Sequence, residues 1–175
     1  MNIGNEFLKS AITRSSYYKT LSEKAMDQLE EADLYFTPSL HSNSIAIIIQ
    51  HMSGNMLSRW TNFLSEDGEK EWRSRDKEFN TEKHDRKELM EIWEKGWACF
   101  LDTLHSLTED DLLKTIHIRR EPLLVIDAIN RQLAHYPHHA GQIVYIAKMI
   151  KGENWKSLSI EKGKSDEFNA QYKPN

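Results

Sequence analysis

The sequence predicts an all-α chain, arranged as a four-helix bundle with a long loop between the second and third helices. Glycine and proline are scarce, with seven and four copies in 175 residues, so the chain lacks the turn density that an all-β fold requires. Apolar residues recur at steps of three and four along four long segments, which is the period of amphipathic helices. Helices with such faces bury them against one another, and four of them favour a bundle.

The first two predicted helices lie on either side of a proline. The first covers about Glu6 to Glu31 and ends before Pro38, through which a helix cannot easily continue. The second begins after a cap at Ser42 or Asn43. Its apolar stripe follows the helical period through Ile45, Ile48, Ile49, Met52, Met56, Trp60 and Phe63.

A long charged segment follows the second helix. Residues 65–85 read SEDGEKEWRSRDKEFNTEKHD and show no sustained period, so we expect a surface loop. Loops of this length are uncommon in compact domains and are often functional. The third helix is predicted from about Arg86 to Leu107, and Thr108 then caps a short turn that is rich in acids.

The last predicted helix is the longest. The β-branched stretch KTIHIRREP suggests a brief extended piece, after which Pro122 stands at a favoured first position of the fourth helix. This helix runs to about Lys151 and is stopped by Gly152. We expect one domain over residues 1–164 and a loosely ordered polar tail over residues 165–175.

Composition excludes several classes of partner. The net charge is −4, and lysine and arginine are scattered among acids, so no basic stripe predicts nucleic-acid binding. No apolar run approaches the roughly 20 residues that span a bilayer, and the first residues lack the apolar core of a signal peptide. We therefore expect a cytoplasmic protein with no membrane partner. The single cysteine, Cys99, excludes a disulfide framework and a cysteine-rich zinc site.

Three histidines crowd into the stretch AHYPHHAGQ, residues 134–142, on the fourth helix. His135 and His139 lie only about 40° apart and one turn along the helix, whereas His138 points about 60° the other way. His51 stands at the edge of the apolar stripe of the second helix and can face that pair. Three neutral imidazoles leave a divalent ion one open position, which is typical of catalytic zinc sites.

The same residues admit simpler interpretations. An HxxxH pair is also common on solvated helix surfaces, and a lone histidine at a stripe edge is usually a hydrogen-bonded core residue. Pro137 removes the backbone bond to the carbonyl of Leu133 and kinks a helix. The kink either lets His135 and His139 converge on a metal or fits the helix around bulky neighbours.

Two quoted stretches carry a family resemblance. HMSGNMLSRW, residues 51–60, together with NRQLAHYPHHAGQIVYIAK, residues 130–148, resembles the DinB-like metal-binding superfamily, and FLSEDGEKEWRSRDKEF resembles its uncharacterised, Bacillus-type branch. The resemblance covers nearly the whole chain. It implies a four-helix bundle, often a homodimer, in which three histidines bind zinc, nickel or a similar divalent metal. Matched residue by residue, these ligands are His51, His135 and His139.

The resemblance implies which residues bind the metal, but it does not identify the reaction. Some relatives are thiol-dependent transferases or isomerases that use bacillithiol, mycothiol or glutathione, and many have no assigned activity. A metal-bound thiol needs no acid or base from the protein, and this suits a sequence that has no Ser-His-Asp motif, no Gly-rich phosphate loop and no HExxH. Our first hypothesis is a metal-dependent S-transferase that joins a low-molecular-weight thiol, by analogy bacillithiol, to an electrophilic small molecule.

Further polar residues are candidates for this site. Arg73, Arg75 and Arg131 can bind carboxylates of the thiol, or they are solvated surface charges. Other candidates that orient the imidazoles or line the pocket are Asn55, Gln132 and Gln142.

Two other functions stay open at this point. The first is a non-catalytic protein, either a metal binder or a stress protein whose fold the metal stabilises. The second is a metal-dependent hydrolase that uses a bound water. Zinc or nickel is the expected ion. The sequence does not choose between them, because imidazole suits several transition metals. The aromatic load, which includes five Trp and six Tyr, together with the resemblance leads us to expect a homodimer.

Overall fold

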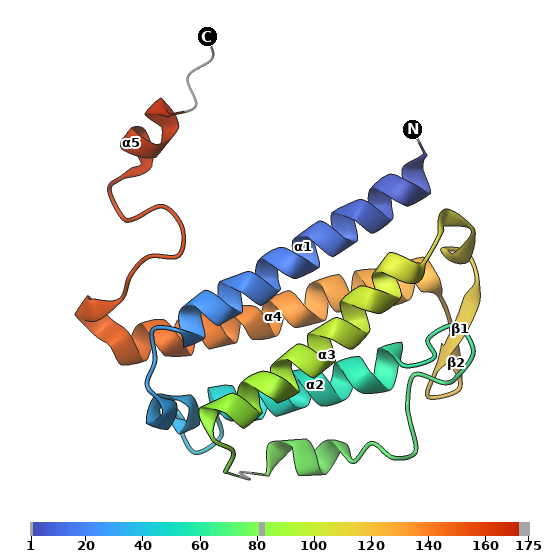
Figure 1. The fold of residues 1–175 in the computed structure, drawn as a ribbon, viewed down its shortest axis with the longest axis horizontal. Coiled ribbons are helices and arrows are strands. Elements are labelled where there is room, and N and C mark those ends of the chain that lie inside the picture. Colours follow the sequence, from blue (N-terminus) through green and yellow to red (C-terminus); the bar gives the residue numbers. More distant parts are fainter. Residues whose placement is uncertain (1, 81–82, 172–175) are drawn as a thin grey trace.

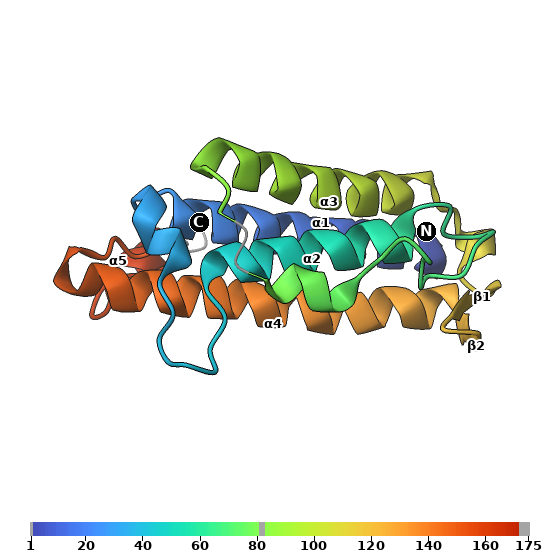
Figure 2. The same cartoon turned by 90° about the horizontal axis from the view of Figure 1, so that it is seen from below.

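The computed structural model of the chain describes residues 2–80 and 83–171, and it is mostly helical. Four long helices lie side by side in Figures 1 and 2: α1 (Ile3–Met26), α2 (Ile45–Trp60), α3 (Arg86–Ser106) and α4 (Val125–Lys151). A short helix, α5 (Ser165–Ala170), follows near the C-terminus. Short 3₁₀ helices lie between these elements: η1 (Glu31–Tyr35), η2 (Arg75–Phe79), η3 (Glu109–Asp111) and η4 (Gly152–Asn154).

The core lies between the four long helices and is rich in aromatic rings. α2 packs most extensively on α3, and α1 on α4. Gly96 allows α3 to approach α2 closely, since a Cβ at that position would lie 2.7 Å from the Cα of Ser53. The indole of Trp60 donates a hydrogen bond of 3.0 Å to the hydroxyl of Tyr136, which satisfies a buried donor. Fully buried rings in this core belong to Trp60, Trp93, Trp97, Phe100 and Tyr136.

The helix ends follow local capping chemistry and correct two sequence predictions. α1 ends at Met26, earlier than Glu31, and the chain then forms the separate turn η1. The cap of α2 is Ser44, rather than Ser42 or Asn43, because the Ser44 hydroxyl accepts a hydrogen bond of 3.3 Å from the amide of Ile47. The predicted start of α3, the acidic turn after Thr108 and the stop of α4 at Gly152 are all present.

A two-stranded sheet precedes α4, so the expectation of an all-α chain was too simple. β1 (Thr115–Ile118) and β2 (Glu121–Leu124) are antiparallel, with His117 opposite Pro122. The predicted extended piece is therefore present, but α4 begins at Val125, and Pro122 lies in β2 instead of at the helix start. Proline suits a strand at the edge of a sheet as well as a first helical turn, because neither place needs its missing N–H.

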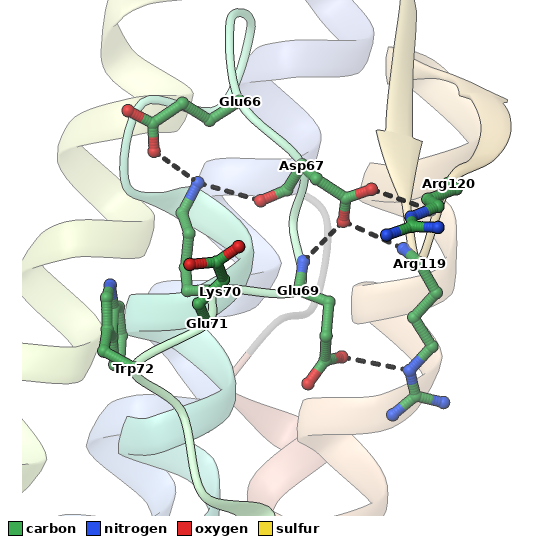
Figure 3. A pocket seen from close by; sticks show the side chains of 8 residues that line it. All are labelled: Glu66, Asp67, Glu69, Lys70, Glu71, Trp72, Arg119 and Arg120. Atoms are coloured by element: carbon green, nitrogen blue, oxygen red, sulfur yellow. Dashed lines mark hydrogen bonds and ion pairs between the residues drawn. The ribbon is translucent and has the colours of Figure 1, made fainter.

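The hairpin turn between these strands is held from outside. Arg119 and Arg120 adopt φ values of 56° and 66°, a left-handed conformation that costs a non-glycine residue about 1 kcal/mol. Both of their backbone amides donate to the carboxylate of Asp67, at 2.9 and 2.7 Å (Figure 3). Asp67 thus ties the segment after α2 to the hairpin and stabilises the turn.

The segment between α2 and α3 is long, as predicted, but it is anchored on α2. The Ser58 hydroxyl donates to the carbonyl of Gly68 at 2.8 Å, and the Arg59 guanidinium donates to the same carbonyl. Beyond this anchor, η2 lies along α2, as the short light-green helix in Figures 1 and 2 shows. This arrangement brings a charged loop to the surface where α2 and α4 meet.

None of the helices in the described part of the chain is long and apolar enough to cross a membrane. In the predicted tail, Ser165–Ala170 forms the exposed helix α5, and residues 172–175 lie outside the described residues. The domain limits at residues 164 and 165 stay a prediction.

Candidate metal centre

Three imidazoles meet where α2 and α4 face each other. His51 of α2 and His135 and His139 of α4 each offer one ring nitrogen, and these three atoms lie within 4.8 Å of one another. The His51 ring centroid is 5.7 Å from that of His135 and 5.0 Å from that of His139. The structure therefore brings together the three histidines that the sequence singled out.

The spacing along α4 accounts for two of the three histidines of this cluster. α4 is assigned as one helix across Pro137, so His135 and His139 lie one turn apart on the same side. Their Nε2 atoms are 3.1 Å apart. The role of Pro137 in this approach stays a hypothesis.

A second shared feature is the oxygen acceptor beside each Nδ1 atom. The Nδ1–oxygen pairs are His51 with Glu78 at 3.0 Å, His135 with Gln132 at 3.2 Å and His139 with Gln142 at 2.8 Å. Because an oxygen acceptor requires the proton on Nδ1, each ring keeps the lone pair of Nε2 free. In this tautomer neither Nε2 atom has a proton to donate across the 3.1 Å between His135 and His139, and a cation bound to both nitrogens would satisfy both lone pairs. This is the tautomer and orientation that a metal site requires.

The electrostatics of the site favour neutral rings. Burial, followed by the charges of His139 and His51, lowers the pKa of His135 to about 4. Burial also lowers the pKa of His139, in spite of its hydrogen bond to Gln142. Neutral imidazole is the form that binds metals, so both ligand nitrogens are available at neutral pH without the loss of a proton.

Glu78, on η2, is the most important residue of the site that the sequence did not predict. Its carboxylate bonds His51 and also accepts two hydrogen bonds from the Arg73 guanidinium, at 2.7 and 3.0 Å. Burial alone raises the pKa of Glu78, but the hydrogen bonds from His51 and Arg73 outweigh it, and the pKa lies below its usual value. Glu78 is thus an ionised carboxylate behind a histidine, the partner that metal-binding histidines commonly have.

Gly54 makes the approach of Glu78 to α2 possible. A Cβ at residue 54 would lie 2.8 Å from the Glu78 Cδ and closer still to its Oε1. Glycine inside a helix costs about 1 kcal/mol relative to alanine, so its place one turn from His51 indicates a close contact. This glycine in HMSGNM is the one sequence signal that could have pointed to an outside partner for His51.

The remaining predicted residues lie near the cluster in different roles. The side-chain oxygens of Gln132 and Gln142 lie within hydrogen-bond distance of His135 and His139. Asn55 accepts a hydrogen bond of 3.1 Å from the Tyr136 hydroxyl and lines a cavity next to His51, a cavity that Arg131 also lines. His138 is exposed and lies 3.1 Å from the side-chain nitrogen of Gln142, outside the cluster.

Comparison with known protein families identifies the family of this chain. A search of curated proteins finds no significant match to the chain. Residues 2–164 match a protein family described as "Protein of unknown function (DUF1572)". The match leaves only the first residue and the polar tail outside it. The chain therefore belongs to the DUF1572 family of proteins of unknown function.

Proposed function

We propose that this chain is a divalent-metal-binding protein of the DinB-like four-helix-bundle type, in which His51, His135 and His139 hold zinc or nickel. The observation that carries this proposal is the common pattern of the three rings. Each Nδ1 atom lies beside an oxygen acceptor, and the three rings meet with Nε2 as the remaining nitrogen. A chance cluster of core histidines has no need of three separate orienting partners.

The spacing of the nitrogens fits such an ion. With metal–nitrogen bonds of 2.0–2.1 Å, two nitrogens of a tetrahedral site lie about 3.3 Å apart. The Nε2 atoms of His135 and His139 are 3.1 Å apart already. His51 needs only a small side-chain movement, since all three ligand atoms lie within 4.8 Å of one another.

We further propose that the site joins a low-molecular-weight thiol, such as bacillithiol, to an electrophilic small molecule. A divalent metal, when bound, makes a coordinated thiol acidic at neutral pH, so no protein base is needed. The sulfur forms a bond to the electrophilic carbon, the bond from that carbon to its leaving group breaks, and the leaving group departs with the electron pair. The thiol proton passes to solvent.

The chain's own residues contribute orientation and access. Glu78, Gln132 and Gln142 hold the imidazoles, and the cavity lined by His51 and His135 gives a ligand a route to the cluster. A three-histidine set also leaves a fourth position open, which a purely structural site does not. These features favour a site that exchanges ligands.

Two measurements test this function. Mass spectrometry of the native protein should find one divalent metal per chain. Addition of 2-mercaptoethanol to the cobalt-substituted protein should produce a sulfur-to-metal charge-transfer band. A protein that binds cobalt but gives no spectral change would contradict the thiol chemistry and favour a non-catalytic metal site. A protein that binds no divalent metal at all would contradict the whole proposal.

A further inference from the structure

Five arginines surround a cavity next to the histidine cluster. The cavity measures about 220 Å³ and reaches the rings of His51 and His135. None of the described residues that line it carries a carboxylate. Besides the two histidines, the lining residues are Asn55, Arg59, Arg73, Arg75, Arg119, Arg131 and Gln132.

The carboxylates that pair with these arginines balance only part of their positive charge. Glu78 pairs with Arg73, and Glu69 pairs with both Arg59 and Arg119, at 2.9 and 3.0 Å. Neither Arg75 nor Arg131 forms an ion pair with any acid in the described part of the chain. Five guanidinium groups against two carboxylates leave a positive excess around a small cavity.

Buried contacts hold Arg59 in place among the residues that line the cavity. Arg59 is only 5% exposed, and its guanidinium donates to the Gly68 carbonyl and to Glu69. Burial, together with the charges of Arg73 and Arg119, lowers the pKa of Arg59 in spite of its bond to Glu69. The positive charges thus already repel one another in the free protein, and a bound anion relieves this repulsion.

The hairpin turn places Arg119 at the rim. Figure 3 shows the Asp67 carboxylate beside the backbone amides of Arg119 and Arg120, while the Arg119 side chain turns toward Glu69. The strained left-handed turn is therefore held by the same segment that carries Glu69. Strain of this kind is found where a structure positions functional groups.

The two unpaired arginines stand beside the histidines. Arg131 precedes His135 by one turn of α4, and both residues line the cavity. The Arg75 guanidinium lies 5.2 Å from the centre of the Phe79 ring. The Phe79 ring in turn lies 5.2 Å from the ring of His51. Both unpaired cations can therefore face a ligand that also reaches the metal centre.

We propose that this cavity, with Arg75 and Arg131 as its unpaired donors, binds a carboxylate or phosphate group of the small molecule that reacts at the histidine cluster. The proposal rests on the proposed function in that the cavity opens on two of the same histidines. Guanidinium groups bind such oxyanions through paired, charge-assisted hydrogen bonds. The volume is below the range of about 300–1,000 Å³ of complete ligand sites, so it suits one anionic portion of a ligand.

Calorimetry on the metal-free protein tests the cavity alone. Succinate and inorganic phosphate are the probes, and the binding should weaken as salt is added. The variants Arg75→Gln and Arg131→Gln should each weaken the preferred anion about tenfold, since each removes one charge-assisted contact. Arg120→Gln is the matched control, because Arg120 is next to Arg119 but does not line this cavity, and it should bind as the native protein does. Failure of both anions to bind, or equal loss in all three variants, would overturn the proposal.

A second titration places the anionic group on one of the two substrates. The cobalt-substituted protein is titrated with mercaptosuccinate, which carries a thiol and two carboxylates, and with 2-mercaptoethanol, which carries no charge. If the anion belongs to the thiol, mercaptosuccinate should develop the charge-transfer band at a concentration at least tenfold lower, and Arg131→Gln should remove that advantage. If it belongs to the electrophile, succinate should bind beside 2-mercaptoethanol without change in the band. Equal midpoints for the two thiols with no succinate binding would contradict the anion site.

The two proposals fail in different ways. A band with 2-mercaptoethanol but no preference for any anion leaves the thiol chemistry in place and refutes the arginine site. Anion binding that depends on Arg75 and Arg131, in a protein that takes up no divalent metal, supports the arginine site and refutes the proposed metal function.

Discussion

The carboxylate of Glu78 occupies the space that a side chain at Gly54 would fill. A Cβ at residue 54 would lie 2.8 Å from the Glu78 Cδ, and from this position Glu78 Oε2 reaches His51 Nδ1 at 3.0 Å. A glycine on α2 thus allows a residue from the loop to orient a histidine on the same helix.

Substitution Gly54→Ala should weaken metal binding. The methyl group displaces Glu78 and leaves His51 without its orienting carboxylate, and loss of such a partner costs about 10- to 100-fold in metal affinity. Competition with a chelator of known affinity measures this change. The variant Glu78→Gln keeps the shape of the side chain but loses its charge, and it should also lower the metal affinity.

Gly141→Ala is the matched control for this prediction. Gly141 lies inside α4 between His139 and Gln142, and a Cβ there would meet nothing within 4 Å. Alanine should therefore raise the free energy of unfolding by up to about 1 kcal/mol and leave metal affinity unchanged. An equal loss of affinity in the two alanine variants would refute the role given to Glu78.

Removal of the metal should destabilise the protein without unfolding it. The aromatic core between the four helices does not include the three histidines, unlike the core of a zinc finger. A bound metal adds about 2.7 kcal/mol at a hundredfold excess over Kd. In EDTA the far-ultraviolet dichroism should stay helical while the Tm falls; loss of the helical signal would show instead that the fold depends on the metal.

Stability at low pH should depend on Asp111, which is not part of the histidine cluster. Hydrogen bonds from Lys114 and from the amide and hydroxyl of Thr108 lower the pKa of Asp111 to about 2. Since the pKa is lower in the folded state than in the unfolded state, this stabilisation is present above about pH 4 and is lost as the pH falls toward 2. Urea denaturation should show that Asp111→Asn is less stable than the native protein at pH 7. The difference should shrink between pH 4 and pH 2, and a constant difference would contradict this account.

The long helices and the histidine cluster could be predicted because their signals are local. Apolar spacing identified α2, α3 and α4 to within about three residues at each end. The one-turn separation of His135 and His139 put both on the same side of α4, and His51 faced them because apolar stripes pack together. Gln132 and Gln142 could be named from the sequence for the same reason, because each lies three residues from its histidine.

The parts that the sequence did not predict depend on contacts between distant segments. Glu78 is 27 residues from His51 in a charged stretch that has no period. The hairpin was missed because its turn residues, Arg119 and Arg120, lack the Asn-Gly pattern that predicts such turns. Asp67, which is more than 50 residues away, supplies the stabilisation that the local sequence lacks.

Metal stoichiometry on four single-histidine variants tests the central claim most directly. His51→Ala, His135→Ala and His139→Ala should each lose tight metal binding, because two imidazoles make a much weaker site than three. His138→Ala should keep about one metal per chain, since His138 is exposed and lies outside the cluster. Mass spectrometry under native conditions gives the four values. If His138→Ala loses the metal while His139→Ala keeps it, the assignment of the ligands is wrong.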